Sequence, residues 1–304
     1  MKSAALSAFV ILTVAAIGAP ASAAAIRVAY AGSMGAVMDQ QIGPAFEKAE
    51  GVTFQGIGQG AYALAHLIGS KQMRADVFVS ITPGPIRILI QDGSIKEAIP
   101  IASTQMVIAY SPSGNFAERF KAAASGKEPW YQILASPGVR FGRTDPATDP
   151  QGQNIIFTFL LAERYYHQPG LATRILGPWR NPAQIFTEPS LLARLESGQI
   201  DASSGYLSAV LSQKLPYIKL PPQINLADPS YADSWYSKVS FNITGPSGQP
   251  VTAKPQPLVF YAAALTDTPN PKLAAQFVAF IAGTKGQEIL RAAGYDAPLG
   301  KVLQ

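Results

Sequence analysis

The chain has 304 residues, no cysteine, only two histidines and a formal net charge of +5 at pH 7. This composition excludes disulfides, thiol catalysis and a histidine-rich metal site. The lysines and arginines are scattered rather than clustered, so the sequence does not favour binding to nucleic acid. A chain of this length forms one large domain or two of medium size.

Residues 1–23 have the pattern of a secretory signal peptide. Lys2 gives a positive start, an apolar run covers 8–17, and an Ala-Ser-Ala cleavage site covers 21–23. The run is too short to cross a bilayer, although an uncleaved N-terminal anchor is an alternative. No cysteine follows the signal, so no lipid anchor is expected. We predict export to the periplasm with cleavage of this peptide.

The first part of the mature chain alternates strand and helix patterns. Three apolar runs are typical of strands, at 26–31, 52–57 and 75–80. Helix-spaced apolar residues lie between them and again over 83–90. This alternation is typical of a doubly wound parallel sheet, in which ligands lie beyond the carboxyl ends of the strands.

The middle of the chain repeats this arrangement. Strands are expected at 104–110, 139–143, 185–186 and 200–206. Helices are expected at 155–166, 190–197 and 207–213. The α/β pattern of the first part therefore occurs a second time.

The last part of the chain returns to the first lobe. Glycines and prolines over 245–257 predict a loop or hinge. A strand over 258–265 and helices over 270–283 and 286–293 follow. We predict a first lobe made of 24–104 and 258–304 and a second lobe made of 105–257, with hinge strands near 104–110 and 257–265.

Two short turns each lead from an expected strand into an expected helix. They are Ala31-Gly32-Ser33-Met34 and Gly58-Gln59-Gly60-Ala61-Tyr62. A helix N-terminus presents unpaired N–H groups and the positive end of the helix dipole. Two such ends side by side would form a neutral-walled site for a small anion. Ser33 would add a hydroxyl donor, although it could also simply cap its helix.

Motifs of the common enzyme classes are missing. The sequence has no Gly-x-Ser-x-Gly, no Ser-x-x-Lys and no His-Glu-x-x-His, and Gly56, Gly58 and Gly60 do not have the dinucleotide-binding spacing. We therefore expect a binding protein with no catalytic residues, cofactor or resident metal. An enzyme on the same two-lobed scaffold is the alternative, which substrate turnover would reveal.

Seven segments in a common order carry a resemblance that extends over nearly the whole mature chain. They are 31–33, 75–80, 144–152, 161–166, 200–208, 217–226 and 270–294. The sequence resembles the periplasmic solute-binding proteins of molybdate and tungstate ABC importers, especially their tungstate-type branch. This resemblance implies the two-lobed periplasmic-binding-protein fold, in which two hinge strands join doubly wound mixed sheets and a ligand is clamped between the lobes. It also implies delivery to a permease driven by an ATPase, contact with the membrane only through that permease, and a monomer.

The resemblance also implies a ligand site, with two of its four characteristic side chains kept. Ser33 matches the first hydroxyl that the family directs at the oxyanion, and Asp149 matches a carboxylate that the tungstate branch brings near the metal centre. Ala61 replaces a serine after Gly60, and Gly205 stands where a glutamate is expected. Two side-chain ligands are therefore missing.

Asp149 has three interpretations. It could be a further ligand to the metal centre, or it could accept a hydrogen bond from a protonated or hydroxyl-bearing ligand. It could instead cap the helix that starts near Gln151. A carboxylate beside a plain tetrahedral dianion is otherwise repulsive.

The other candidate residues also have alternative roles. The backbone N–H groups of Ala61 and Tyr62 can remain donors, and Gln151 could donate its amide. Ser204, with Ser203, could replace the lost glutamate by a hydroxyl or could face solvent. Tyr62 and Tyr206 could contact the ligand or pack in the core, and we expect Arg143 to form a surface salt bridge.

We predict a solute-binding protein for a small oxyanion, with molybdate or tungstate first. The same transport role for a small carboxylate, a phosphonate or another polar organic solute is the alternative. A sensor that presents its ligand to a membrane receptor is a third class.

Overall fold

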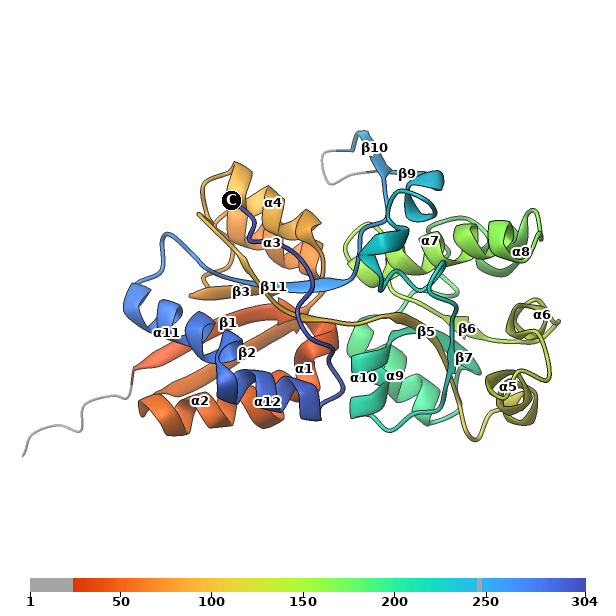
Figure 1. Cartoon of the computed structure of the whole chain (residues 1–304), viewed down its shortest axis with the longest axis horizontal. Coiled ribbons are helices and arrows are strands. Elements are labelled where there is room, and N and C mark those ends of the chain that lie inside the picture. The colour runs from red at the N-terminus through yellow and green to blue at the C-terminus, as the bar shows by residue number, and fades with distance from the viewer. Residues whose placement is uncertain (1–23, 245–247) are drawn as a thin grey trace, which may run out of the picture.

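The computed structural model describes residues 24–244 and 248–304. The predicted signal peptide therefore lies outside the described residues. Two sheets with flanking helices lie side by side (Figure 1), and we name them the first lobe and the second lobe. The predicted mixed α/β fold is confirmed.

The first lobe is built on a five-stranded sheet of order β2-β1-β3-β11-β4. Its strands are β1 (Ala25–Ala31), β2 (Thr53–Gln59), β3 (Val77–Ser80), β4 (Ile99–Ser103) and β11 (Val259–Ala264). β1 pairs in parallel with β2 and β3, whereas β11 runs antiparallel to β3 and β4. Since β1 and β2 are parallel, their carboxyl ends meet at the same edge and carry both predicted anion-binding turns there.

Helices cover both faces of this sheet. One continuous helical stretch contains η1 (Gly32–Met34), α1 (Gly35–Val37), η2 (Met38–Ile42) and α2 (Gly43–Glu50). The others are α3 (Ala61–Gly69), α4 (Pro83–Gln91), α11 (Pro271–Ala282) and α12 (Thr284–Ala292). α3 and α4 lie on one face, and α2, α11 and α12 on the other (Figure 1). α2 ends at Gly51, whose φ of 68° favours glycine.

The second lobe is built on a four-stranded sheet of order β6-β7-β5-β8. Its strands are β5 (Met106–Tyr110), β6 (Phe141–Gly142), β7 (Ala202–Tyr206) and β8 (Tyr217–Lys219). Its helices are α5 (Ala117–Ala124), α6 (Trp130–Leu134), α7 (Pro150–Tyr165), α8 (Leu171–Leu176), α9 (Glu188–Glu196) and α10 (Leu207–Ser212). α7 and α9 begin earlier than the sequence predicted because Asp149-Pro150 and Glu188-Pro189 form their first turns.

Alternation along β7 separates the two faces of this sheet. Ser204 and Tyr206 face α7 and form hydrogen bonds with its side chains. Gly205 points the other way, where a Cβ would meet Val210 at 2.6 Å and Val107 at 3.7 Å. The period of two along a strand therefore directs the hydroxyls of Ser204 and Tyr206 to one side and Gly205 towards a separate apolar cluster.

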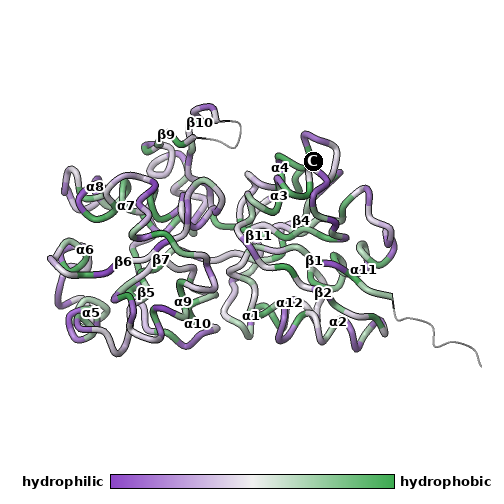
Figure 2. Tube along the Cα trace, turned by 180° about the vertical axis from the view of Figure 1, so that it is seen from behind, coloured by the Kyte–Doolittle hydropathy of each residue, from purple (hydrophilic) through white to green (hydrophobic). Residues whose placement is uncertain are grey.

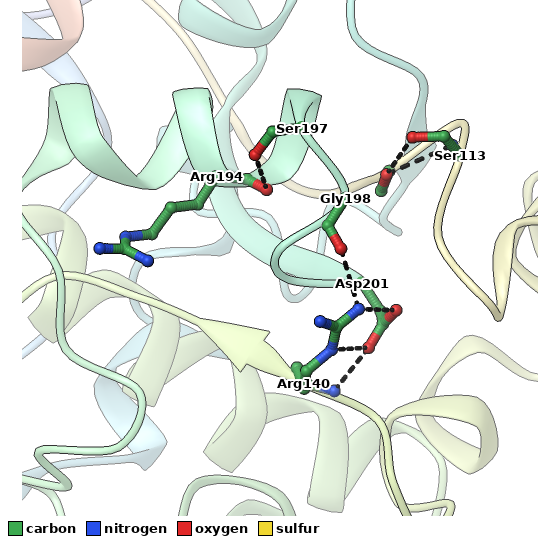
Figure 3. Close-up of polar contacts among 7 residues, drawn as sticks. Ser113, Arg140, Arg194, Ser197, Gly198 and Asp201 are labelled. Atoms are coloured by element: carbon green, nitrogen blue, oxygen red, sulfur yellow. Dashed lines mark hydrogen bonds and ion pairs between the residues drawn. The ribbon is translucent and has the colours of Figure 1, made fainter.

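A bidentate ion pair fixes the start of β7 beside β6 (Figure 3). The Arg140 side chain donates to both carboxylate oxygens of Asp201, at 3.0 and 2.9 Å, and its backbone N–H donates to Asp201 at 2.8 Å. Asp201 is buried, and Arg140 also donates to the carbonyl of Gly198. This pairing sets the register of the strand that carries Ser204 and Tyr206.

The chain crosses between the lobes at two adjacent places (Figure 1). The backbone N–H of Thr104 donates to the carbonyl of Leu258 at 3.2 Å, which joins the two crossovers directly. Leu258 in turn donates to Leu226 at 3.0 Å. The lobe boundaries at 104/105 and 257/258 stay a prediction.

The predicted loop over 245–257 contains a strand. β10 (Pro250–Ala253) pairs antiparallel with β9 (Phe241–Thr244) in a two-stranded hairpin, and residues 245–247 lie outside the described residues. The loop prediction was wrong for 250–253 because proline is tolerated at the first residue of an edge strand. The hairpin projects beyond the lobes on the side of α4 and α7 (Figure 1).

Apolar residues follow the strands in the interior of both lobes, and hydrophilic residues lie on the outer helix faces (Figure 2). Within residues 24–244 and 248–304, none of the helices has the length and apolar character needed to cross a bilayer. In the first lobe Phe277 forms an edge contact with Phe46 at 5.0 Å and stacks on Phe54 at 5.9 Å. These rings join α11 to α2 and β2.

We predict that Phe277→Ala lowers the free energy of unfolding by about 3–5 kcal/mol, because it leaves a cavity where three rings meet. Urea unfolding followed by circular dichroism measures this loss. Leu299→Ala is the control, since Leu299 is 41% exposed and its truncation should cost at most about 0.5 kcal/mol. Equal losses in the two variants would contradict the importance of the aromatic cluster.

Candidate functional site

Four helical segments begin at the boundary between the lobes. η1 and α3 come from the first lobe, and α7 and α9 come from the second. The N–H of Ala63 in α3 donates to the carbonyl of Thr148, just before α7, at 3.2 Å. A cavity of about 560 Å³ opens at this boundary, lined among others by Gly60, Asp149 and Glu188. The predicted turns therefore face the second lobe.

Gly60 lies where the two lobes approach most closely at α3. A Cβ at this position would meet the carbonyl oxygen of Thr148 at 2.7 Å and Cβ of Asp149 at 3.2 Å. Only glycine fits between these groups without a shift of backbone. Ala61, which follows, is buried and presents a methyl group where the resemblance expected a hydroxyl.

Ser33 is buried at the start of η1, with an exposed fraction of 5%. Its hydroxyl has no hydrogen-bond partner among the described residues, and the N-cap of η1 is Ala31 with no side-chain capping bond. The alternative role of Ser33 as a cap is therefore wrong. Burying a hydroxyl without a hydrogen-bond partner costs free energy. The hydroxyl of Ser33 is therefore available to donate a hydrogen bond to a ligand.

Asp149 is the N-cap of α7. Its carboxylate accepts a hydrogen bond from the backbone N–H of Gln151 at 2.8 Å, as the capping interpretation predicted. The side chain is 7% exposed and also lines the cavity between the lobes. Burial raises the pKa of Asp149 to about 6, although the Gln151 N–H and the Thr144 hydroxyl oppose this rise.

Glu188 is a second buried carboxylate at this boundary, and the sequence prediction missed it. It is the first residue of α9 and is 5% exposed. Burial raises its pKa well above the ordinary value, and the negative charge of Asp149 raises it further. The backbone amide of Ser33 and the side chain of Gln151 oppose this rise. Its sequence signal was an acidic residue before proline in the first turn of a helix.

Gln151 and Ser204 connect Glu188 to β7. The Ser204 hydroxyl donates to Oε1 of Gln151 at 2.7 Å, and Nε2 of Gln151 donates to Oε1 of Glu188 at 3.0 Å. All three side chains are buried. This chain of bonds fixes the Gln151 amide so that its donor end faces Glu188. Gln151 and Ser204, which the sequence prediction named as site residues, thus lie near the boundary and form hydrogen bonds with other side chains of the protein.

Tyr206 lies deeper at the same boundary. It accepts a hydrogen bond from Nδ2 of Asn154 at 3.0 Å. Burial raises its pKa well above the ordinary value, and the charges of Asp149 and Glu188 add to this effect. Tyr62 is half-buried and lines a neighbouring cavity of about 350 Å³ together with Asn154.

Among the predicted site residues, Gly60 and Asp149 line the 560 Å³ cavity, Ser33 lines a neighbouring cavity of about 400 Å³, and Gly205 points to the opposite face of β7. Its missing side chain would point at Val210, in the apolar cluster behind β7. A glutamate at 205 could not reach the cavity from this backbone without displacing Val210. Glu188, from α9, places a different carboxyl group at the boundary between the lobes.

The expectation of a surface salt bridge for Arg143 was wrong. Arg143 has no exposed surface, and its guanidinium donates to the carbonyls of Trp179 and Pro178 and to Oε1 of Gln184, at 2.7, 3.1 and 3.0 Å. Burial lowers its pKa to about 10. The backbone of Arg143 also bridges to Ile185, so Arg143 anchors the loop that leads into α9 and Glu188.

The carboxylates at the boundary have no nearby cation. In the described part of the chain neither Asp149 nor Glu188 forms an ion pair. Residues 24–244 and 248–304 also contain no group of three or more His, Cys, Asp or Glu side chains that could hold a metal ion. The 560 Å³ cavity is therefore lined by neutral donors, by the two carboxyl groups of Asp149 and Glu188, which form no ion pair, and by Asp145, which pairs with Arg180.

This fold and this boundary define a two-lobed solute-binding architecture. The model of the bacterial extracellular solute-binding protein family matches residues 26–296. The chain belongs to that family.

Curated relatives agree with this family assignment. The chain is 30% identical over 259 residues to the molybdate/tungstate-binding protein WtpA of Pyrococcus abyssi, covering 79% of this chain and 73% of that protein. It is 33% identical over 199 residues to an uncharacterized solute-binding protein of Petrotoga mobilis, covering 64% of this chain and 60% of that protein.

Among solved structures, the periplasmic molybdate-binding protein of Azotobacter vinelandii superposes with a TM-score of 0.62 at 16% identity, covering 90% of this chain and all of that chain. The sulfate-binding protein SubI of Mycobacterium tuberculosis superposes with a TM-score of 0.59 at 14% identity, covering 90% and 87%. At these identities the two structures show a shared fold.

We predict that the two boundary carboxylates make the protein less stable as pH rises. Both carboxyl groups have raised pKa values, so the folded state binds their protons more tightly than the unfolded state. Their contribution to the free energy of unfolding is therefore present at about pH 4 and is lost as pH rises to about 7. For Asp149 the rise from 3.8 to about 6 corresponds to roughly 3 kcal/mol.

Urea unfolding across this pH range tests the prediction in wild type and in an Asp149→Asn, Glu188→Gln double variant. The double variant should gain stability relative to wild type as pH rises. Glu196→Gln, at the exposed end of α9, should leave the wild-type pH dependence unchanged. Parallel curves for wild type and the double variant would contradict the prediction.

We predict that Arg143→Lys lowers the free energy of unfolding by about 2 kcal/mol or more, because one ammonium group cannot reach all three acceptors of the guanidinium. Arg180→Lys is the matched control. Arg180 is an exposed arginine in the same loop that pairs with Asp145, and its replacement should cost at most about 1 kcal/mol. Chemical denaturation measures both, and similar losses would contradict an anchoring role for Arg143.

Proposed function

We propose that this protein is the periplasmic solute-binding component of an ABC importer and that its ligand is a small oxyanion, with molybdate or tungstate first. The buried and unpartnered hydroxyl of Ser33 at the boundary between the lobes carries this proposal. The named function of the Pyrococcus abyssi relative supports the choice of ligand. In this role the protein binds its solute without turnover and delivers it to a permease and its ATPase.

The binding energy would come from neutral donors. The hydroxyl of Ser33, the backbone amide of Ser33 and the first amides of α3 all lie on the first-lobe side of the boundary. Hydrogen bonds to a charged acceptor are about twice as strong as neutral ones and need no opposing cation. Closure of the lobes around the ligand would bring the second lobe into contact with it.

Asp149 would set the choice among oxyanions. Above a pH of about 6 its carboxylate is negative, so it repels a fully ionised tetrahedral dianion such as sulfate. It can instead approach an anion that carries its own proton, or one whose metal centre accepts a further oxygen ligand. The second case favours molybdate and tungstate over sulfate.

An organic solute is the second candidate, and one observation favours it. The cavity of about 350 Å³ beside the boundary contains Tyr62 and Asn154 as well as the apolar side chains of Ile88, Phe157 and Ile243. Apolar walls with a few polar groups are typical of sites for small organic molecules. A small carboxylate or phosphonate with an apolar part would occupy this cavity, whereas Ser33 lines a separate cavity of about 400 Å³.

Thermal unfolding of the mature protein with molybdate, tungstate, sulfate, phosphate and a panel of small organic anions tests the proposal, because a ligand that binds only the folded state raises Tm. We expect molybdate or tungstate to raise Tm and sulfate to have little effect. A response to organic anions alone would favour the second candidate.

We predict that Ser33→Ala weakens binding of the active anion by at least about 1 kcal/mol, because a donor to a charged group is lost. Calorimetric titration measures the change in Kd. Ser70→Ala is the control, since Ser70 is an exposed serine of the same lobe. Unchanged affinity in Ser33→Ala would place this hydroxyl outside the site.

A further inference from the structure

Glu188 reaches from the second lobe onto the first lobe at the turn that contains Ser33. Oε2 of Glu188 lies 2.8 Å from the position that a Cβ of Gly32 would take, so the carboxylate fills the space directly over this turn. The backbone amide of Ser33 faces the same carboxylate. Because Gly32 has no side chain, an acceptor from the other lobe can approach the turn closely.

The groups that lie against the Glu188 carboxylate are hydrogen-bond donors of the kind that bind an oxyanion. Nε2 of Gln151 donates to Oε1 of Glu188 at 3.0 Å, and the backbone amide of Ser33 lies close enough to lower the pKa of this carboxyl group. Both are neutral donors, and Glu188 forms no ion pair within the described residues. A carboxylate oxygen and an oxyanion oxygen accept the same hydrogen bonds at such donors.

The charged and titratable groups around Glu188 do not favour its carboxylate form. Asp149, in the same lobe, raises its pKa, and Glu188 in turn raises the pKa values of Tyr206 and Tyr295. Glu188 is thus held by donors while a like charge opposes it. A contact of this kind can be exchanged for a better anion.

We propose that Glu188 is a tethered acceptor that takes the place of an anionic oxygen at the Ser33 turn, holds the two lobes together when no solute is bound, and is displaced by the incoming oxyanion. This inference rests on the proposed function only for the identity of the displacing anion. The Thr148 carbonyl, which accepts from Ala63 at 3.2 Å, makes a corresponding contact at α3.

A neighbouring cavity can accommodate the Glu188 carboxylate after its displacement. Together with the Ser33 turn, Glu188 lines a second cavity of about 400 Å³ that extends to Asp39, Gln40 and Gln213. A carboxylate that turns into this space regains water, and the amide of Ser33 becomes available to the ligand. Because Glu188 is part of the same chain, it competes at a high effective concentration.

The distance between the lobes tests this proposal directly, because the chain contains no cysteine and two labels can be introduced at chosen places. Gln72→Cys in the first lobe and Ala183→Cys in the second lobe are exposed positions for spin labels. Distance distributions are measured without added anion and with sodium molybdate. The labelled protein is compared with versions that also carry Glu188→Ala, Glu188→Gln or, as the control, Glu118→Gln at an exposed glutamate of α5 in the same lobe.

Without added anion, we expect a short inter-label distance in the labelled protein and in Glu118→Gln. Glu188→Ala should shift the distribution to longer distances, Glu188→Gln should do so in part, and molybdate should restore the short distance. Both variants should also bind molybdate more tightly, by about tenfold for Glu188→Ala, since an internal competitor for the same donors is gone.

Two results would overturn the proposal. One is an unchanged distance distribution in Glu188→Ala without anion, with circular dichroism confirming that the variant is folded. The other is weaker molybdate binding in both Glu188 variants, which would make Glu188 a direct ligand. If molybdate binds none of the proteins, the proposed ligand is wrong, whereas the distances measured without anion still decide the role of Glu188.

Discussion

The boundary between the lobes is organised by two carboxylates of like charge that are buried close to each other. Asp149 and Glu188 are 7% and 5% exposed, and burial raises the pKa of each. Neutral donors hold them: the amide of Gln151 for Asp149, and the Gln151 side chain with the Ser33 amide for Glu188. Removing charge from water without a counter-ion is costly, so this boundary holds its carboxylates only weakly and can exchange one for a ligand.

The second lobe supports these groups with arginines that lie behind the site. Arg143 binds three acceptors of the loop that leads to Glu188, and Arg140 pairs with Asp201 at the start of β7. Both cations are engaged with the protein and neither forms an ion pair with the boundary carboxylates. The structure therefore uses cations to hold the scaffold in place and uses neutral dipoles at the boundary, which is the arrangement that binds an anion reversibly.

The two crossovers lie where the lobes can rotate relative to each other at a low cost in free energy. Thr104 and Leu258 are joined by a backbone hydrogen bond, so both connections lie at one place and can act as a single hinge. The polar contacts between the lobes at the site, such as that of Ala63 with Thr148, use acceptors that a bound oxyanion could replace. When the lobes open or the ligand is exchanged, solvent or ligand would then replace most of the polar interactions that are broken.

The sequence by itself determined the alternation of strands and helices, the return of the chain to the first lobe and the position of both first-lobe turns. These features follow from local periodicity and from glycine and serine at strand ends, which act over a few residues. It also predicted the capping geometry of Asp149 as one of three alternatives, because an Asp-Pro pair before a helix is a local signal. The short strand β4 and the hairpin strand β10 were missed, since Pro100 and Pro250 obscure their patterns.

Only the tertiary structure decided which side chains meet between the lobes. Glu188 lies 155 residues after Ser33 in the chain, and no local pattern relates the two. Gly205 occupies the sequence position expected for a carboxylate, yet the pleat of β7 directs that position into an apolar cluster. Arg143 had every sequence property of a surface residue and is fully buried. Direction, burial and cross-lobe contact depend on how distant segments pack, and therefore they could not be obtained from short-range sequence patterns.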